Sequence, residues 1–151
     1  MRARRIGSRL AAAAVVAGAV TAGGYAVAAG GSDRGEALGP GEATVMLEID
    51  DSRFSTDRIV VRPGTDLRFV VVNDDPINHE LIVGGPEVHR RHRDGKEMEH
   101  PPVPGEVSVG PGEIVTTSYH LHDPGTVTFA CHLPGHLAYG MVGEIVVQEE
   151  R

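Results

Sequence analysis

The chain has only one cysteine, Cys131, and this scarcity limits what the thiol can do. A single cysteine forms no internal disulfide, so the crosslinks on which small secreted domains usually rely are excluded. The thiol is therefore reactive, intermolecular, buried or bound to a metal. The neighbouring residues decide between these possibilities.

Acidic residues are missing from the first 28 residues, while four arginines stand among the first nine. A run of small apolar residues follows from Leu10 to Ala22, and Ala26-Val27-Ala28 has the A-x-A pattern of a cleavage site. We therefore interpret Met1–Ala28 as an export signal. The alternative is an uncleaved membrane anchor, because the apolar stretch is nearly long enough to span a bilayer. Both interpretations place the domain in the periplasm or on the outer face of the cytoplasmic membrane.

Basic residues are scarce in the rest of the chain. Without Met1–Ala28, ten Lys and Arg face twenty-one Asp and Glu, a net charge of −11. This balance excludes nucleic acid, whose phosphates require a basic surface, and favours a basic protein partner. The roughly 120 residues that remain suffice for one domain with one core, which we expect to be a monomer.

Helical periodicity and internal repeats are absent beyond the N-terminal segment. Short β-branched and apolar segments alternate instead with turns rich in Pro, Gly and Asp. The predicted strands are Val45–Ile49, Ile59–Val61, Leu67–Val72, Glu80–Val83, Val107–Val109, Ile114–His122, Thr126–Cys131 and Gly143–Gln148. Seven or eight short strands with regular turns predict an all-β domain over residues 43–151, an antiparallel sandwich or barrel.

Two segments do not follow this pattern of strands. Residues 29–42 are rich in glycine and charge and are predicted to form a flexible linker. Residues 84–105 are predicted to form a long polar loop, a kind of segment that is often functional in compact domains. This loop contains possible copper ligands among charged residues, and the two interpretations are a labile copper site or a solvated surface. The possible ligands are His89, His92, Met98 and His100.

The stretch "FACHLPGHLAYGM" carries the strongest signal for chemistry. Cys131 ends a predicted strand, His136 follows after a Pro-Gly turn, and Met141 comes five residues later. The chain between them can therefore direct a thiolate, an imidazole and a thioether to one point. A second imidazole is expected from His79, which opens the strand after the turn "NDDPIN". Two histidines and a cysteine with a distant methionine form the donor set of blue copper sites.

These motifs resemble those of a known family. "FACHLPGHLAYGMVGEIVV" is similar to the C-terminal ligand segment of the cupredoxins, especially the rusticyanin-like and bacterial copper-tolerance branches, and "NHELIVGG" resembles their first ligand segment. The resemblance covers about Ala43 to Gln148. It implies a Greek-key β-sandwich with one type 1 copper. His79, Cys131 and His136 would be the equatorial ligands and Met141 the axial ligand.

One position departs from the family pattern. Many members have Asn directly after the first histidine, where its side chain holds the cysteine loop, whereas here Asn78 precedes His79 and Glu80 follows it. The partner that orients the loop is therefore not evident from the sequence. Glu80 is also a hard oxygen donor, so it is a second candidate as a copper ligand, although alternation along the strand directs it away from His79.

The resemblance implies a binding and redox module, and we expect no enzymatic activity. The first hypothesis is an electron shuttle. Its redox partners would dock on the apolar residues around His136. The alternative for these residues is that they only close the end of the core. The alternative is copper sequestration in copper tolerance. The docking residues would be Leu133, Pro134, Leu137, Ala138 and Tyr139.

A third hypothesis is a small copper oxidoreductase. Cys131-His132 resembles the electron path of the multicopper oxidases, and His120-x-His122 resembles their paired ligands. Those enzymes need more histidines than the eight of this chain, and Ala130 stands where their flanking histidine would be. A second copper shared between subunits remains compatible with the number of histidines, but the sequence indicates no catalytic pocket.

Overall fold

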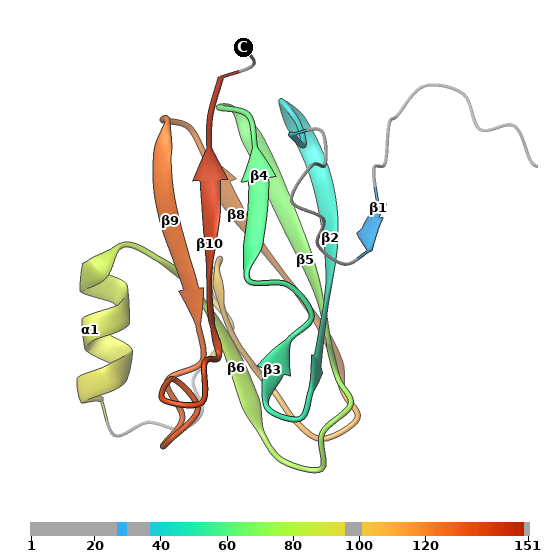
Figure 1. The fold of residues 1–151 in the computed structure, drawn as a ribbon, viewed down its shortest axis with the longest axis vertical. Coiled ribbons are helices and arrows are strands. Elements are labelled where there is room, and N and C mark those ends of the chain that lie inside the picture. Colours follow the sequence, from blue (N-terminus) through green and yellow to red (C-terminus); the bar gives the residue numbers. More distant parts are fainter. Residues whose placement is uncertain (1–26, 30–36, 96–100, 150–151) are drawn as a thin grey trace, which may run out of the picture.

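A computed structural model describes residues 27–29, 37–95 and 101–149. They form two β-sheets packed face to face, with one helix beside them (Figure 1). One sheet has the order β1-β2-β5-β8, with β3 paired to β2, and the other has the order β4-β10-β9-β6-β7. The elements are β1 (Val27–Ala29), β2 (Gly41–Asp50), β3 (Arg53–Phe54), β4 (Arg58–Val61), β5 (Thr65–Asn73), β6 (His79–Gly84), α1 (Pro86–Asp94), β7 (Glu106–Val109), β8 (Ile114–Leu121), β9 (Gly125–Ala130) and β10 (Val142–Val147).

The all-β prediction is confirmed, and the fold is a Greek-key β-sandwich. Each of the eight predicted strands is present, and the short strands β1 and β3 are additional. The expectation of purely antiparallel sheets is wrong, because β2 pairs with β5 and β4 pairs with β10 in parallel. The chain crosses to the second sheet between β2 and β5, so it returns in the same direction. Turn residues alone do not reveal such crossovers.

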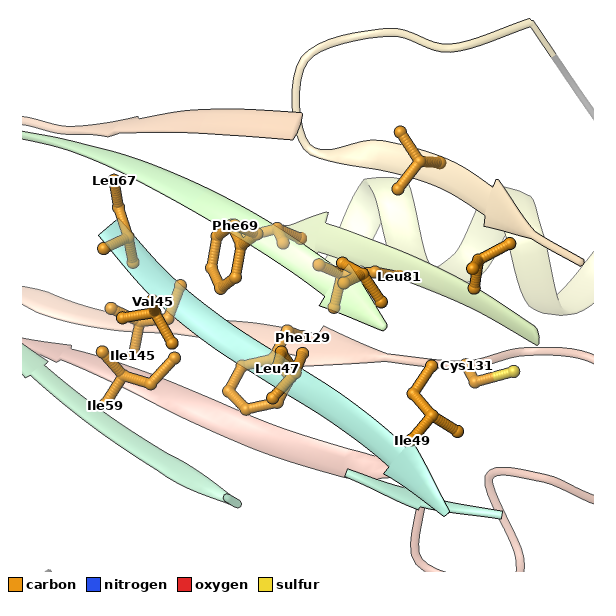
Figure 2. Close-up of a cluster of buried hydrophobic side chains, with 14 of the residues drawn as sticks. Val45, Leu47, Ile49, Ile59, Leu67, Phe69, Leu81, Phe129, Cys131 and Ile145 are labelled. Atoms are coloured by element: carbon orange, nitrogen blue, oxygen red, sulfur yellow. The ribbon is translucent and has the colours of Figure 1, made fainter. Parts of the chain in front are cut away.

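Alternation along the strands builds the core between the sheets. In β2 the buried positions are Ala43, Val45, Leu47 and Ile49, while most of the residues between them are exposed. Figure 2 shows side chains from both sheets meeting in one layer, with Cys131 at one end of it. The core therefore ends at the only thiol of the chain.

The predicted polar loop contains a helix, so this prediction is wrong for residues 86–94. Pro86 begins α1, Glu87 lies in the first turn, and basic residues fill the last turn, which complements the helix dipole. None of its residues is fully buried, so the sequence shows no apolar residues that recur at helical spacing. Polar contacts dock α1 instead. The His89 ring contacts the carbonyl oxygens of Gly84 and Thr128, and Arg91 binds Glu106.

The N-terminal part of the sandwich extends into the predicted linker. Leu38 bridges to Val61, and β2 begins at Gly41. Residues 27–29 form β1, which pairs in parallel with Thr44–Met46 of β2. The predicted export signal otherwise lies outside the described residues and stays a prediction. Within the described ranges, no helix has the length and apolar character needed to cross a bilayer.

Candidate metal centre

Three of the four predicted ligands converge at one end of the sandwich. The donor atoms of His79, Cys131 and His136 all lie within 4.8 Å of one another. His79 is the first residue of β6, Cys131 directly follows β9, and His136 lies in the loop before β10. The rings of His79 and His136 have centroids 4.7 Å apart. Two neighbouring strands of one sheet, β6 and β9, and the loop from β9 to β10 therefore hold the group.

The loop of residues 131–141 is closed by its own backbone. The N–H of Cys131 donates to the carbonyl oxygen of Met141 at 3.0 Å, and the N–H of Met141 donates to that of His136 at 3.1 Å. Gly135 has φ +89°, a conformation that suits glycine, so the predicted Pro-Gly reversal is present. Met141 is fully buried here. Its role as axial ligand stays a prediction.

His79 has the hydrogen bonding of a metal ligand. Its Nε2 lies 2.8 Å from the Asp75 carboxylate, so Nε2–H donates a hydrogen bond to the carboxylate and the lone pair is on Nδ1. This Nδ1 is buried and has no hydrogen-bond partner in the described part of the chain. Such an atom is costly in a core unless a ligand satisfies it. A metal ion bound by His79 would do so.

Asp75 stays ionised in this position. Burial favours its neutral form, but hydrogen bonds from the backbone N–H of Ser52, from His79 and from the N–H of Asp51 outweigh that effect and lower the pKa of Asp75. Asp75 is not among the site residues predicted from the sequence. The signal was present in "NDDPIN", which places a carboxylate four residues before His79.

The Cys131 thiol is protonated without a metal. Burial raises its pKa to about 11, although backbone hydrogen bonds from Leu133 and Glu80 act in the opposite direction. Its Sγ lies 3.3 Å from Nδ1 of His136. Burial and the nearby His79 lower the pKa of His136, so this ring is neutral and offers a lone pair. A metal ion would have to displace only the thiol proton.

We predict that copper binding releases this proton. Because the pKa of Cys131 is raised, the thiol is protonated at neutral pH and the affinity for copper should rise about tenfold per pH unit. Calorimetric titrations in buffers with different ionisation enthalpies would count the released protons. Equal heats in all buffers would contradict the prediction.

Glu80 holds the cysteine loop. Its carboxylate accepts a hydrogen bond of 2.7 Å from the backbone N–H of His132, the residue after Cys131. Glu80 is 2% exposed, so this hydrogen bond is shielded from water. Glu80 therefore supplies the contact expected of asparagine in the family. It lies outside the three-donor group, so the hypothesis of Glu80 as a copper ligand is not supported.

We predict that Glu80→Gln raises the reduction potential of bound copper. The carboxylate charge lies close enough to raise the pKa of Cys131, and the same charge should stabilise Cu(II) more than Cu(I). Glutamine keeps an oxygen that can accept the bond from His132 and removes only the charge. Each tenfold change in the relative affinity for the two ions corresponds to about 60 mV. Voltammetry of both proteins would measure the shift, and an unchanged or lower potential would refute it.

The other histidines make separate contacts. His120 contacts Asp66, and its Nε2 lies 3.0 Å from Nδ1 of His122 at the exposed end of β8. His132 contacts His89 on α1 instead. The three histidines of the oxidoreductase hypothesis therefore contact different residues, since His120 and His122 contact each other and His132 contacts His89. Burial and nearby positive charge lower the pKa of His132 to about 4. Of the predicted loop ligands, His89 and His92 lie on α1, whereas Met98 and His100 lie outside the described residues.

The apolar residues around His136 divide into two kinds. Leu133 is buried in the core and is not available for docking. Leu137 is 39% exposed and Tyr139 is 72% exposed, and Pro134 and Ala138 are also at the surface. His136 itself is half-buried, so part of its ring reaches this surface.

The donor set fits copper. A thiolate with two imidazoles is a soft and borderline set that suits copper, and such an ion would satisfy the buried Nδ1 of His79. Asp75 and Glu80 already supply the outer hydrogen bonds that orient metal ligands.

Comparison with known proteins agrees with this assignment. Residues 41–148 match the model of copper binding proteins of the plastocyanin/azurin family, and the chain belongs to this family. It is therefore a copper-binding protein, and His79, Cys131 and His136 form its candidate type 1 site.

Relatives and solved structures extend the comparison. The chain is 35% identical over 119 residues, 72% of each protein, to the copper-resistant cuproprotein CopI of Rubrivivax gelatinosus. It is 30% identical to CopI of Vibrio cholerae, over 66% of this chain and 62% of that protein. The fold is similar to that of auracyanin from Roseiflexus castenholzii, with a TM-score of 0.59 and 21% identity over 70% of this chain and 97% of that one.

Proposed function

We propose that the protein is exported and binds copper in copper tolerance. The convergence of His79, Cys131 and His136 within 4.8 Å, with their outer hydrogen bonds formed, carries the proposal. The names of its CopI relatives and the predicted export segment support it. Copper held by this donor set supplies one-electron redox chemistry, because it can change oxidation state without changing ligands.

The surrounding residues favour tight retention of copper. Asp75 fixes the ring of His79, and Glu80 fixes the backbone after Cys131. His79 and Cys131 are each at most 1% exposed, so water and competing ligands reach them poorly. A site with these features requires little rearrangement when the ion binds.

Growth under copper stress tests the proposal. A copper-sensitive bacterium should grow at higher copper concentrations with the wild-type gene than with Cys131→Ser. Immunoblots would establish that both proteins are exported at equal levels. Equal growth with both genes would disprove a role of this site in tolerance.

Electron shuttling is the second candidate. The observation that favours it is the small apolar surface of Leu137 and Tyr139 beside the half-buried His136, because brief redox encounters use small contacts. The acidic chain would suit a basic partner.

Tyr139→Lys, which replaces an exposed ring by a charge that repels a basic partner, separates the two functions. It should slow electron transfer to a basic c-type cytochrome by about tenfold or more if this surface docks redox partners, and copper binding should not change. Growth under copper stress should then fall only if electron transfer is required for tolerance. An unchanged rate would contradict docking at this surface.

A further inference from the structure

Helix α1 lies beside β9 and contacts the residue that follows Cys131 (Figure 1). Nδ1 of His89, on α1, lies 2.8 Å from Nε2 of His132. The centroids of these two rings are 5.1 Å apart, and both side chains are half-buried. The segment that the sequence predicts to be a polar loop therefore reaches the direct neighbour of a predicted copper ligand.

The other side of the His89 ring is bound to the sheet. Its Nε2 lies 3.1 Å from the carbonyl oxygen of Gly84 and 3.2 Å from that of Thr128, two residues that face each other where β6 pairs with β9. Carbonyl oxygens only accept, so the proton of His89 is on Nε2 and the lone pair is on Nδ1, which faces His132. His89 thus connects α1, the sheet and residue 132.

These contacts fix the direction of the hydrogen bond between the two rings. Nδ1 of His89 accepts, so Nε2 of His132 donates. The other tautomer of His132 would place its proton on Nδ1, which is buried and has no hydrogen-bond partner among the described residues. A buried donor without a partner is costly, so the proton belongs on Nε2.

Residue 132 is held in two directions. Its backbone N–H donates to the Glu80 carboxylate at 2.7 Å, and its side chain donates to His89. A planar peptide bond joins His132 to Cys131, so a rotation of residue 132 also moves the backbone of Cys131. The position of the thiol therefore depends on a contact made by a helix outside the sheets.

The chain is adapted to a close approach of α1. A Cβ atom at Gly84 would lie 3.0 Å from Cβ of Val88 on α1, so a side chain at this position would push the helix away from β6. No residue of α1 is fully buried, and Arg91 adds a further polar contact through its bonds to Glu106 at 2.6 and 2.7 Å. Polar contacts therefore place α1, and the contact with His132 extends their effect to the loop of residues 131–141.

We propose that His89 is a positioning residue of the copper site, through which α1 holds the loop of residues 131–141 closed over Cys131. His89 does not touch the metal and acts through His132. Its hydrogen bond opposes opening of the loop in the metal-free protein and slows the loss of copper from the loaded protein. The inference rests on copper binding at the type 1 site and does not depend on the proposed role in tolerance.

His89→Ala tests the proposal in two states of the protein. The Cys131 thiol is fully buried, so iodoacetamide reaches it in the metal-free protein only when the loop opens. Loss of one hydrogen bond changes such an opening equilibrium by about two- to tenfold, and alkylation of Cys131 should be faster by that factor. Release of copper from the loaded protein to an excess of chelator should be faster by a similar factor.

Two further variants separate this bond from the general docking of α1. His89→Asn places an oxygen near the position of Nδ1, where it can accept from His132 and should restore most of the protection. Arg91→Ala is the matched control, because it removes the contact of α1 with Glu106 and leaves His132 untouched. Both rates should change by less than about twofold in this control.

A double-mutant cycle distinguishes positioning from a merely structural role. In a protein that carries His132→Ala, the additional substitution His89→Ala should no longer change either rate, because His89 acts through the ring of His132. If His89 only docked α1 on Gly84 and Thr128, its effect would be the same with and without the His132 side chain.

Equal alkylation and release rates in His89→Ala and in the wild type would overturn the proposal. An equal acceleration in Arg91→Ala, or an effect of His89→Ala that persists beside His132→Ala, would overturn it as well. A wild-type protein that binds no copper would refute the type 1 site instead. The alkylation rates are measured without metal and would still decide whether His89 holds the loop.

Discussion

Cys131→Ser is expected to abolish the intense visible absorption of the copper-loaded protein and to weaken copper binding by more than about 100-fold. The band arises from charge transfer between the thiolate and Cu(II), and a serine hydroxyl remains protonated and is a poor copper ligand. Serine is nearly isosteric, and Cys131 is fully buried at the end of the core, so the fold should persist. Absorption spectra and competition with chelators of known affinity would measure both effects.

Met141→Leu is the matched comparison for this prediction. Leucine fills a similar buried volume but removes the thioether, so the band should shift and weaken without disappearing. A wild-type protein that binds Cu(II) and stays colourless would refute the ligand set. An unshifted band in Met141→Leu would refute the axial role of Met141 alone.

Local patterns explain what could be predicted from the sequence. Alternation in segments such as Val45–Ile49 identified the strands, because side chains of a strand point to opposite faces in turn. Cys131, His136 and Met141 share one loop, so their spacing alone indicated a common site. His79 required only the expectation that a strand begins after a turn.

Features that depend on distant contacts were not predicted. The parallel pairing of β2 with β5 depends on a crossover between sheets, which leaves no local signal. Helix α1 is held by polar contacts and has no apolar stripe. The contact of His132 with His89 joins residues 43 positions apart. The bond from Glu80 to the backbone of His132 was not predicted either, because it depends on the register of β6 and β9.

Two buried polar residues connect the copper site to the rest of the sandwich. The Asn73 side chain donates to the carbonyl oxygens of Ile77 and Gly110 at 2.8 and 2.9 Å, and its oxygen accepts from the N–H of Asp75 at 3.0 Å. The segment before His79 is therefore fixed to the turn after β7. Asp75 continues this connection to the turn after β2, where it binds the N–H of Asp51 and of Ser52.

Asp75→Ala is therefore expected to destabilise the metal-free protein by about 3 kcal/mol or more. The carboxylate accepts bonds of 2.9 Å from Asp51, 2.8 Å from Ser52 and 2.8 Å from His79. Hydrogen bonds to charged groups contribute about 1.5–3 kcal/mol each, and unsatisfied buried donors add a penalty. Copper affinity should also fall about 10–100-fold, because the ring of His79 loses the partner that orients it.

Urea unfolding of the metal-free protein and chelator competition would measure these two effects separately. Asp74→Ala is the matched control, because Asp74 is the exposed neighbour and should change stability by less than about 0.5 kcal/mol. Asp75→Asn keeps an acceptor oxygen and should lose less stability than Asp75→Ala. Equal stability of Asp75→Ala and Asp74→Ala would refute this prediction. The Asp75 carboxylate would then not be the group that links the turn after β2 to the segment before His79.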